Sequence, residues 1–153
     1  MTTSPGASDP RTAAADLMRI LEEQVAAMNA HDSARFAAFY SNDALVRDPQ
    51  YPEPLQGRAA VATDFTTFVT AFPDLRAEVT CSVVSGRTLA AEMTIAGTQT
   101  GPLTLPSGDV PPTHKALRFD MAYFDRFDEH GLIVDERRYY DVADQLEQLG
   151  LSG

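Results

Sequence analysis

The apolar residues of this chain change their spacing near Pro73. Before that point they recur at helical intervals, in residues 10–30 and again in residues 58–72. Beyond it they alternate with polar residues in four segments: 75–85, 88–100, 115–127 and 132–140. Short turns separate the first two segments and the last two, so each pair predicts a hairpin. Helices followed by an antiparallel sheet indicate an α+β fold.

Shorter elements are expected between these segments. Asp32 can cap a second helix that carries Phe36, Phe39 and Tyr40, and a strand is expected at residues 44–48. Asp141 can cap a last helix, which Gly150 is expected to end. Helices on one face of a strongly curved sheet leave a cavity, which is a natural ligand site.

Two proline-rich segments are expected to be loops. Residues 49–57 hold three prolines and a glycine, and residues 101–113 are long enough to form a lid or rim. Residues 1–8 are small and polar, which predicts a disordered tail. Asp9 and Pro10 then provide a cap and a first helical position. Residues 9–153 are therefore expected to form a single domain.

The charge balance argues against several classes of partner. The net charge is −10, from 22 acidic and 12 basic residues, so nucleic acid and anionic membranes would be repelled. No apolar run reaches transmembrane length, and no basic region precedes an apolar one at the N-terminus, so a cytoplasmic protein is expected. Cys81 is the single cysteine and is expected to be a small buried hydrophobe in a strand.

Asp48 ends the first expected strand, directly before a proline. Alternation places it on the same face as Ala44 and Val46. On a face that lines an apolar cavity, it is a general base for removing a proton from carbon. The alternative is a turn aspartate that bonds nearby backbone, since Asp-Pro often begins a turn.

Several motifs resemble known families. AAMNAHDSARFAAFYSNDALVRDP (26–49), followed by PLQGRAAV, resembles the opening of ketosteroid isomerases and of the wider nuclear transport factor 2-like superfamily. FPDL (72–75), GTQTG (97–101) and the ending DEHGLIVDERRYYDVADQLEQLG resemble SnoaL-like polyketide cyclases. The resemblance covers roughly residues 12–150. It implies a curved antiparallel sheet wrapped around helices, with an internal cavity, and chemistry of the kind used in antibiotic biosynthesis.

The resemblance also implies roles for single residues. Asp48 matches the general base of ketosteroid isomerase, whose tyrosine oxyanion donor is replaced by Gln24. Tyr123 stands where that enzyme has a protonated acid, and near the position where the cyclases have a histidine. When Asp141 is matched to the second aspartate of the cyclases, Arg138 takes the place of their catalytic aspartate.

Arg138 shares a strand face with Glu136 and Tyr140. If that face lines the cavity, Arg138 binds a carboxylate or enolate oxygen and favours ionised Asp48; the alternative is an ion pair with Glu136 alone. The epoxide hydrolases of the superfamily need an acid at this position, together with an Arg-x-Asp pair where this chain has residues 92–94. The hydrolase triad is therefore absent from the matching positions.

The expected site follows from these comparisons. Asp48, Tyr123 and Arg138 are the predicted catalytic residues. The predicted substrate-binding residues are Gln24, Tyr51, Phe68, Phe72, Met93, Met121, Glu136 and Tyr140. The three histidines show no metal-ligand spacing, so neither a metal nor another cofactor is expected.

The sequence thus predicts an enzyme, a cofactor-independent cyclase or isomerase for an apolar, carbonyl-bearing, polyketide-like substrate. It would act by proton transfer, by folding the substrate for ring closure, or by both. The alternatives are a small-molecule binding or dimerisation module without chemistry, and an epoxide hydrolase or dehydratase. A homodimer is expected through the open sheet face, on the basis of Leu117, Ala122 and Ile133.

Overall fold

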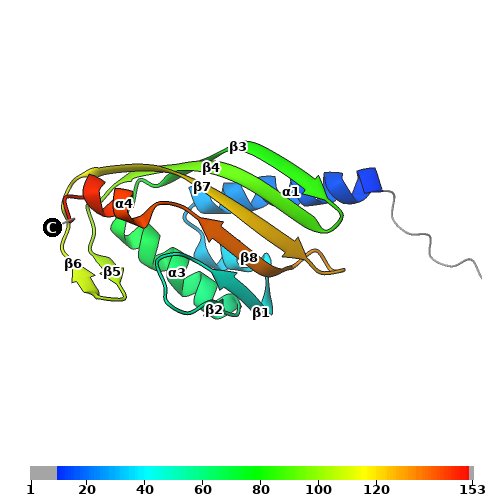
Figure 1. Cartoon of the computed structure of the whole chain (residues 1–153), viewed down its shortest axis with the longest axis horizontal. Helices are drawn as coiled ribbons and strands as arrows, with labels where there is room; N and C mark the ends of the chain where they lie inside the picture. Colours follow the sequence, from blue (N-terminus) through cyan, green and yellow to red (C-terminus); the bar gives the residue numbers. More distant parts are fainter. Residues whose placement is uncertain (1–9, 152–153) are drawn as a thin grey trace, which may run out of the picture.

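The computed structural model describes residues 10–151, in which helices cover one face of a curved sheet (Figure 1). The tail expected at residues 1–8 and the Asp9 cap lie outside the described residues. The helices are α1 (Pro10–Asn29), α2 (Ser33–Ala37), α3 (Arg58–Ala71) and α4 (Val142–Gln148). The strands are β1 (Tyr40–Arg47), β2 (Leu55–Gln56), β3 (Arg76–Ser85), β4 (Thr88–Thr98), β5 (Leu103–Leu105), β6 (Gly108–Val110), β7 (Ala116–Phe127) and β8 (Ile133–Tyr139).

Within the described residues, six strands form the main sheet in the order β2-β1-β8-β7-β4-β3. The two expected hairpins are present, β3 with β4 and β7 with β8. Neighbours in the sheet are antiparallel except for β1 and β8, which run parallel. Helices beside this sheet give the predicted α+β fold class, which is confirmed.

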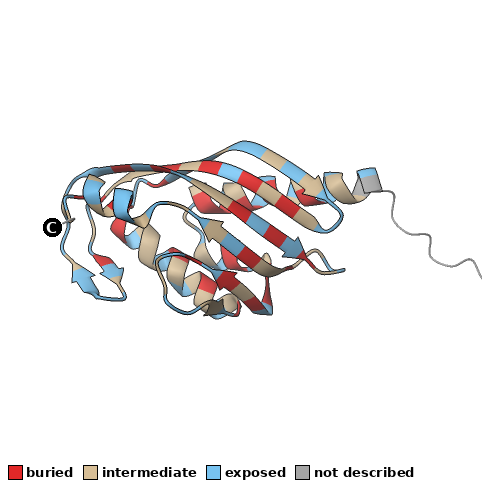
Figure 2. Ribbon diagram, viewed as in Figure 1, coloured by how far each residue is buried: buried red, intermediate tan, exposed pale blue. Residues whose placement is uncertain are grey.

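The inner face of the sheet and the facing helix stripes form the core. Along most of β4 and β7 buried residues alternate with half-buried or exposed ones (Figure 2), as expected for strands with one well-covered face. On α1 the buried residues Leu17, Leu21, Gln24 and Met28 follow at helical spacing and form one stripe. Gln24 therefore faces the interior rather than solvent.

The helix caps follow the sequence prediction. Asp32 accepts a hydrogen bond from the Arg35 amide (3.0 Å), and Asp141 accepts one from the Asp144 amide (3.0 Å). The expected extent of the second helix is wrong, because α2 ends at Ala37. Beyond it, the Phe39 carbonyl accepts a hydrogen bond from the Ile133 amide (2.9 Å), which draws this segment into the sheet, and Tyr40 begins β1.

A β-bulge explains why the prediction for Cys81 is wrong. Val79 pairs with Met93, but Cys81 pairs with the adjacent Glu92, so β3 carries one extra residue at Thr80. The extra residue reverses the alternation, and Cys81 is exposed instead of buried.

Both expected loops contain short strands. In residues 49–57, β2 pairs with β1. In residues 101–113, β5 and β6 form a small hairpin, and β5 contacts α3. None of residues 101–113 lines the main cavity, so the expected lid or rim is not found there.

The apolar residues on which the dimer prediction rests are only partly at the surface. Leu117 is 3 % exposed and Ile133 is fully buried, so both were placed on the wrong face. The large apolar side chains exposed on the outer face of β7 and β8 are Phe124 and Tyr139, whose rings meet edge to face at 6.2 Å.

Candidate functional site

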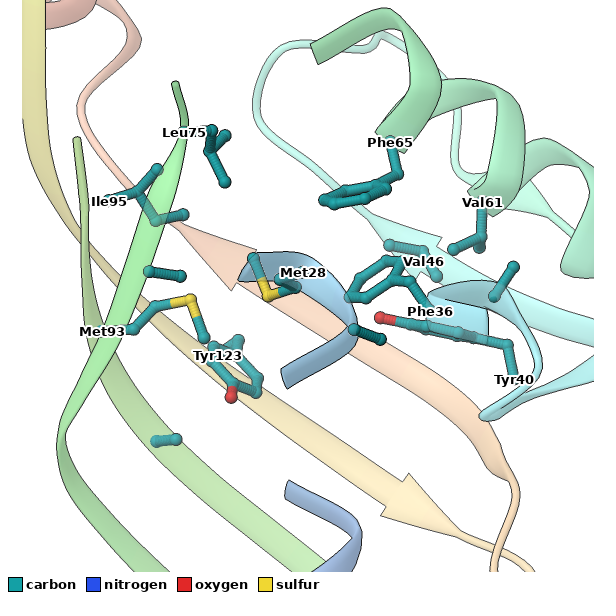
Figure 3. Close-up of a cluster of buried hydrophobic side chains, with 14 of the residues drawn as sticks. Met28, Phe36, Tyr40, Val46, Val61, Phe65, Leu75, Met93, Ile95 and Tyr123 are labelled. Carbon is teal, nitrogen blue, oxygen red and sulfur yellow. The ribbon is translucent and has the colours of Figure 1, made fainter. Parts of the chain in front are cut away.

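A cavity lies between the inner face of the sheet and the helices, with an empty volume of about 720 Å³ including its open mouth. Much of the wall is apolar, and Figure 3 shows part of it: Met28, Phe36, Phe65, Leu75, Met93 and Ile95. The charged groups of the wall lie together where the end of β1 meets β8.

The sheet register determines which side chains share that polar side. Tyr123 of β7 lies opposite Arg138 of β8, and Asp125 lies opposite Glu136. On the other side of β8, the parallel strand β1 brings Asp48 next to Arg138. Residues 90 positions apart in the chain therefore meet because the first and last long strands are neighbours.

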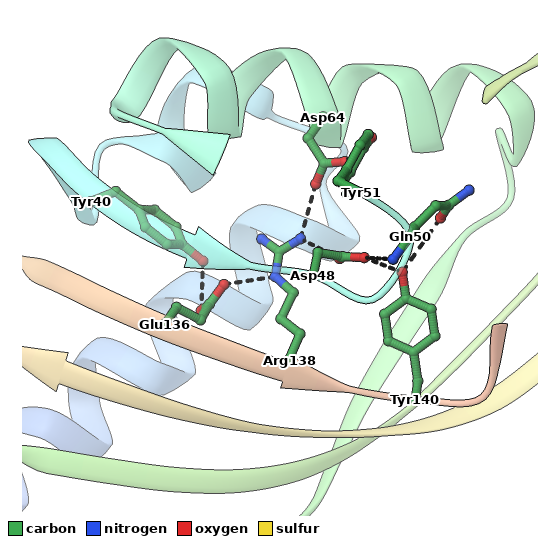
Figure 4. A network of polar contacts seen from close by, with 8 residues as sticks. All are labelled: Tyr40, Asp48, Gln50, Tyr51, Asp64, Glu136, Arg138 and Tyr140. Carbon is green, nitrogen blue, oxygen red and sulfur yellow. Dashed lines mark hydrogen bonds and ion pairs between the residues drawn. The ribbon is translucent and has the colours of Figure 1, made fainter. Parts of the chain in front are cut away.

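Arg138 is the centre of a network of ion pairs (Figure 4). Its Nη1 donates to Asp48 Oδ2 (3.0 Å) and to Asp64 Oδ2 (2.9 Å), and its Nε donates to Glu136 Oε2 (2.7 Å). Burial alone would lower the pKa of Arg138, but the carboxylates, Glu136 first, raise it above its ordinary value. The guanidinium stays charged, and Nη2 donates to no described residue.

Each carboxylate of the network also accepts one tyrosine hydroxyl: Tyr140 donates to Asp48 (2.5 Å), Tyr51 to Asp64 (2.6 Å) and Tyr40 to Glu136 (2.8 Å). Burial, and then the adjacent carboxylate, raise the pKa of all three tyrosines above the ordinary value. The hydroxyls therefore remain protonated and act as hydrogen-bond donors.

Asp48 has the location that the first alternative requires and the turn contact of the second, and its role as a base stays a prediction. The side chain lines the cavity and is buried, and its Oδ1 also accepts a hydrogen bond from the Gln50 amide (2.9 Å), as in an Asp-Pro turn. With Tyr140 and Arg138 as further donors, Asp48 accepts three hydrogen bonds. Likewise Arg138 lines the cavity and also pairs with Glu136.

Tyr123 and Gln24 are buried polar residues of a different kind. Both line the cavity, at 3 % and 5 % exposure, and the side chain of neither hydrogen-bonds to a described residue. Burial, followed by the charges of Asp125 and Glu136, raises the pKa of Tyr123, so its hydroxyl is a neutral donor. Buried polar groups normally have partners, which leaves these two to interact with the contents of the cavity.

Most of the other expected binding residues line the cavity: Phe68, Met93, Met121, Glu136 and Tyr140. Two of the expected binding residues do not line it. Phe72 is buried beside the wall, with its ring centroid 4.8 Å from that of Phe68. Tyr51 donates its hydroxyl to Asp64, which does line the cavity.

Sequence reasoning missed Asp64, Gln50 and Gln145, which all line the cavity. Helical spacing from the buried Val61 and Phe65 could have identified Asp64, since it lies on the same face of α3. Nothing in the local sequence distinguishes Gln50, whose position depends on the turn after β1.

Asp125 was also missed, although it alternates with Tyr123 along β7. It is 1 % exposed, and its Oδ1 has no hydrogen-bond partner among the described residues. Burial and the neighbouring Glu136 raise the pKa of Asp125 well above its ordinary value. The protonated acid is thus favoured behind the cavity wall.

Within residues 10–151, no group of three or more His, Cys, Asp or Glu side chains is arranged to hold a metal ion. In the same part of the chain, every helix is too short or too polar to cross a membrane. The expectations about cofactors and localisation stay predictions.

A curved sheet closed by helices around one cavity is the architecture of the nuclear transport factor 2-like fold. Residues 15–149 match the model of the family described as SnoaL-like polyketide cyclase, and the chain belongs to this family. No curated protein matches the sequence significantly.

Three solved structures illustrate the likeness in fold. AclR from Streptomyces galilaeus, a candidate hydroxylase, is 23 % identical with a TM-score of 0.75, over 89 % of this chain and 82 % of AclR. TsrD from Streptomyces laurentii is 20 % identical with a TM-score of 0.76, over 90 % of this chain and 97 % of TsrD. IdmH from Streptomyces antibioticus, a candidate polyketide cyclase, is 23 % identical with a TM-score of 0.69, over 88 % of this chain and 98 % of IdmH.

Proposed function

We propose that the protein is a cofactor-independent cyclase or isomerase for an apolar, carbonyl-bearing small molecule of polyketide type. The observation that carries the proposal is one mainly apolar cavity with Asp48, Arg138 and Tyr123 together in its wall. Membership of the SnoaL-like family supports the same substrate class.

Two donors are available to a substrate oxygen. The Tyr123 hydroxyl and the Arg138 Nη2 make no hydrogen bond to the described residues, and the two residues are opposite each other in the sheet. Both are suited to a carbonyl oxygen that gains negative charge as an enolate forms. One such donor typically contributes about 10²–10³ in rate.

Asp48 is the proposed proton acceptor. It takes a proton from the carbon next to the bound carbonyl, and the electron pair moves onto the carbonyl oxygen. In isomerisation Asp48 returns the proton to another carbon; in ring closure the enolate carbon attacks a second carbonyl, whose oxygen takes the proton. Folding of the substrate by the cavity also contributes, because it brings the reacting carbons of a flexible molecule together.

The test uses a linear poly-β-ketone thioester and a β,γ-unsaturated cyclic ketone as probes, with products identified by mass spectrometry and NMR. Asp48→Asn and Tyr123→Phe are each expected to slow turnover at least about 100-fold. Asp120→Asn, on the exposed outer face beside Thr94, is the control and is expected to retain the rate. A loss below about 10-fold for Asp48→Asn would exclude Asp48 as the essential base.

A binding module without chemistry predicts that both probes bind saturably and leave unchanged. If both probes bind and neither is converted, the result supports the binding module over the proposed enzyme.

One observation favours an epoxide hydrolase as a second candidate. Arg138 Nη1 donates to both Asp48 and Asp64, so a guanidinium lies between two carboxylates. The known hydrolases have an arginine and two acids as well, but at other positions of the fold. Two carboxylates so placed can activate a water for attack on an epoxide carbon. Hydrolysis of 1,2-epoxydecane in ¹⁸O-labelled water, with the label in the diol and loss of activity in Asp64→Asn, would support this candidate.

A further inference from the structure

The charges that face the cavity do not balance. Among the described residues in its wall, Arg138 carries the one positive charge, against the three carboxylates Asp48, Asp64 and Glu136. Arg138 forms an ion pair with each of them. An apolar cavity with two uncompensated negative charges favours a ligand that brings positive charge.

The three carboxylates share one guanidinium. Each accepts a hydrogen bond from Arg138 and another from a neutral tyrosine hydroxyl, which brings no charge. Arg138 therefore cannot balance more than one of them.

The apolar part of the wall also suits a cation. The rings of Phe68 and Phe119 meet edge to face at 6.3 Å, and those of Phe119 and Tyr140 lie 5.4 Å apart. Tyr140 donates to Asp48, so this run of aromatic rings leads directly to the carboxylates. Aromatic faces attract ammonium groups, and more strongly where water is excluded.

An independent observation indicates that the cavity is made to hold a ligand. Gln24 and Tyr123 are both more than nine-tenths buried in its wall, and their polar groups bond to no described residue. A neutral donor and an amide are suited to oxygen functions on the body of the same ligand.

We propose that the molecule bound in this cavity carries a protonated amine on an apolar, oxygen-bearing body, and that a free carboxylate is excluded. The amine would lie among Asp48, Asp64 and the aromatic rings, where it supplies the missing positive charge. The inference deepens the proposed function by naming the charge of its substrate, and it rests on the cavity being the substrate site.

The test compares three probes with one apolar body: 2-naphthylmethylamine, 2-naphthylmethanol and 2-naphthoate. Binding to the intact protein is measured by calorimetry at about pH 7 and about 20 mM salt, where surface screening is weak. The amine is expected to bind at least about tenfold more tightly than the alcohol, and the carboxylate more weakly than either. Equal binding of amine and alcohol, tightest binding of the carboxylate, or binding of none would each overturn the proposal.

Asp64→Asn locates the effect. Removing this charge is expected to reduce the preference for the amine over the alcohol by roughly threefold or more, whereas Asp120→Asn on the outer face leaves it unchanged. A preference that is the same in both variants contradicts a binding site among the carboxylates. Should Asp64→Asn not fold, the wild-type protein gives the test. Its preference for the amine over the alcohol should persist at about 500 mM salt, because salt screens attraction to the acidic surface far more than a buried charge pair. Loss of the preference at that salt concentration would contradict a site among the carboxylates.

Binding alone is measured, so the result does not depend on turnover. Selective amine binding without any reaction would uphold the inference and contradict the proposed enzyme. Turnover of neutral ketones without amine selectivity would support the proposed enzyme and contradict the inference.

Discussion

Arg138 holds three carboxylates that would otherwise repel one another inside the protein. Arg138→Met keeps most of the side-chain volume and removes the charge, so the free energy of unfolding is expected to fall by about 3–5 kcal/mol at pH 8. Urea unfolding of both proteins measures the loss.

Arg137→Met is the matched control, since Arg137 points outward from the same strand and pairs with Asp135 at 3.6 Å. A change of less than about 1 kcal/mol is expected there. Equal losses in the two variants would contradict the claim that Arg138 stabilises the protein through its buried ion pairs.

Asp125 is expected to make the free energy of unfolding fall as the pH rises. Burial and Glu136 raise the pKa of Asp125 in the folded state, so folding favours its protonated form. Its contribution to stability is complete below the unfolded pKa of about 3.9 and is lost as the pH rises through the raised folded value. Asp125→Asn is therefore expected to flatten the fall in the free energy of unfolding from about pH 5 to pH 9.

Asp128 provides a control of opposite sign. Backbone amides, that of Leu132 first, lower the pKa of this exposed carboxyl. Its contribution is present above the unfolded pKa and is lost as the pH falls through the lowered folded value. Asp128→Asn should change the acid side of the stability profile only, and an effect confined to the alkaline side would contradict this assignment.

Strand alternation grouped several site residues but did not say which group lines the cavity. It put Asp48, directly after β1, on the face of Val46, and it put Glu136, Arg138 and Tyr140 on one face at β8 and its end. It failed at Cys81, because a single inserted residue reverses the phase of a strand. It could not identify the hydroxyl that Tyr51 donates to Asp64, since that contact depends on how a turn packs against a helix.

At the scale of elements, residues 101–113 are attached to the end of α3 at Gly101. The Gly101 amide donates to the Ala71 carbonyl (3.1 Å), and a Cβ at Gly101 would overlap the Thr70 carbonyl oxygen. Gly101→Ala is expected to lower the free energy of unfolding by about 2 kcal/mol or more, because backbone atoms must move. Thermal and urea unfolding measure the change.

Gly86→Ala separates this overlap from ordinary backbone strain. Gly86 has a φ of 58° in the β3–β4 turn, but a Cβ there would have no neighbour within 4 Å. A loss of about 1 kcal/mol is expected from the left-handed conformation alone. An equal or larger loss than that of Gly101→Ala would contradict close packing at Gly101.

The long elements were predictable and the short ones were not. Apolar spacing identified α1, α3 and both hairpins, since each is long enough for its period to repeat. The strands β2, β5 and β6 have two or three residues each, too few to show a period. The parallel pairing of β1 with β8 depends on the whole sheet, and no local pattern reports it.

For the molecule as a whole, the cavity is expected to matter more to activity than to stability. Met121→Trp enlarges a side chain in its wall and fills empty space, so ligand binding and turnover should be lost. The free energy of unfolding should change by less than about 2 kcal/mol, since no packed neighbour need be displaced. Parallel measurements of unfolding and of probe binding decide this, and retained binding would show that the ligand lies elsewhere.

The homodimer stays a prediction. Sedimentation equilibrium of the wild-type protein and of Phe124→Asp tests it, because Phe124 and Tyr139 are the large apolar side chains exposed on the outer face of β7 and β8. A dimer through this face should dissociate in the variant. A wild-type protein that sediments as a monomer contradicts the prediction.

Among the described residues β8 is the last strand in sequence, yet it occupies an inner position of the sheet, between β1 and β7. A nascent chain that has not yet emerged from the ribosome beyond residue 132 holds its two half-sheets apart, each with an unpaired edge. Such edges are templates for aggregation, so the polypeptide is most vulnerable just before β8 emerges. A premature stop codon shortly before β8 would therefore be expected to yield insoluble material rather than a weakened protein.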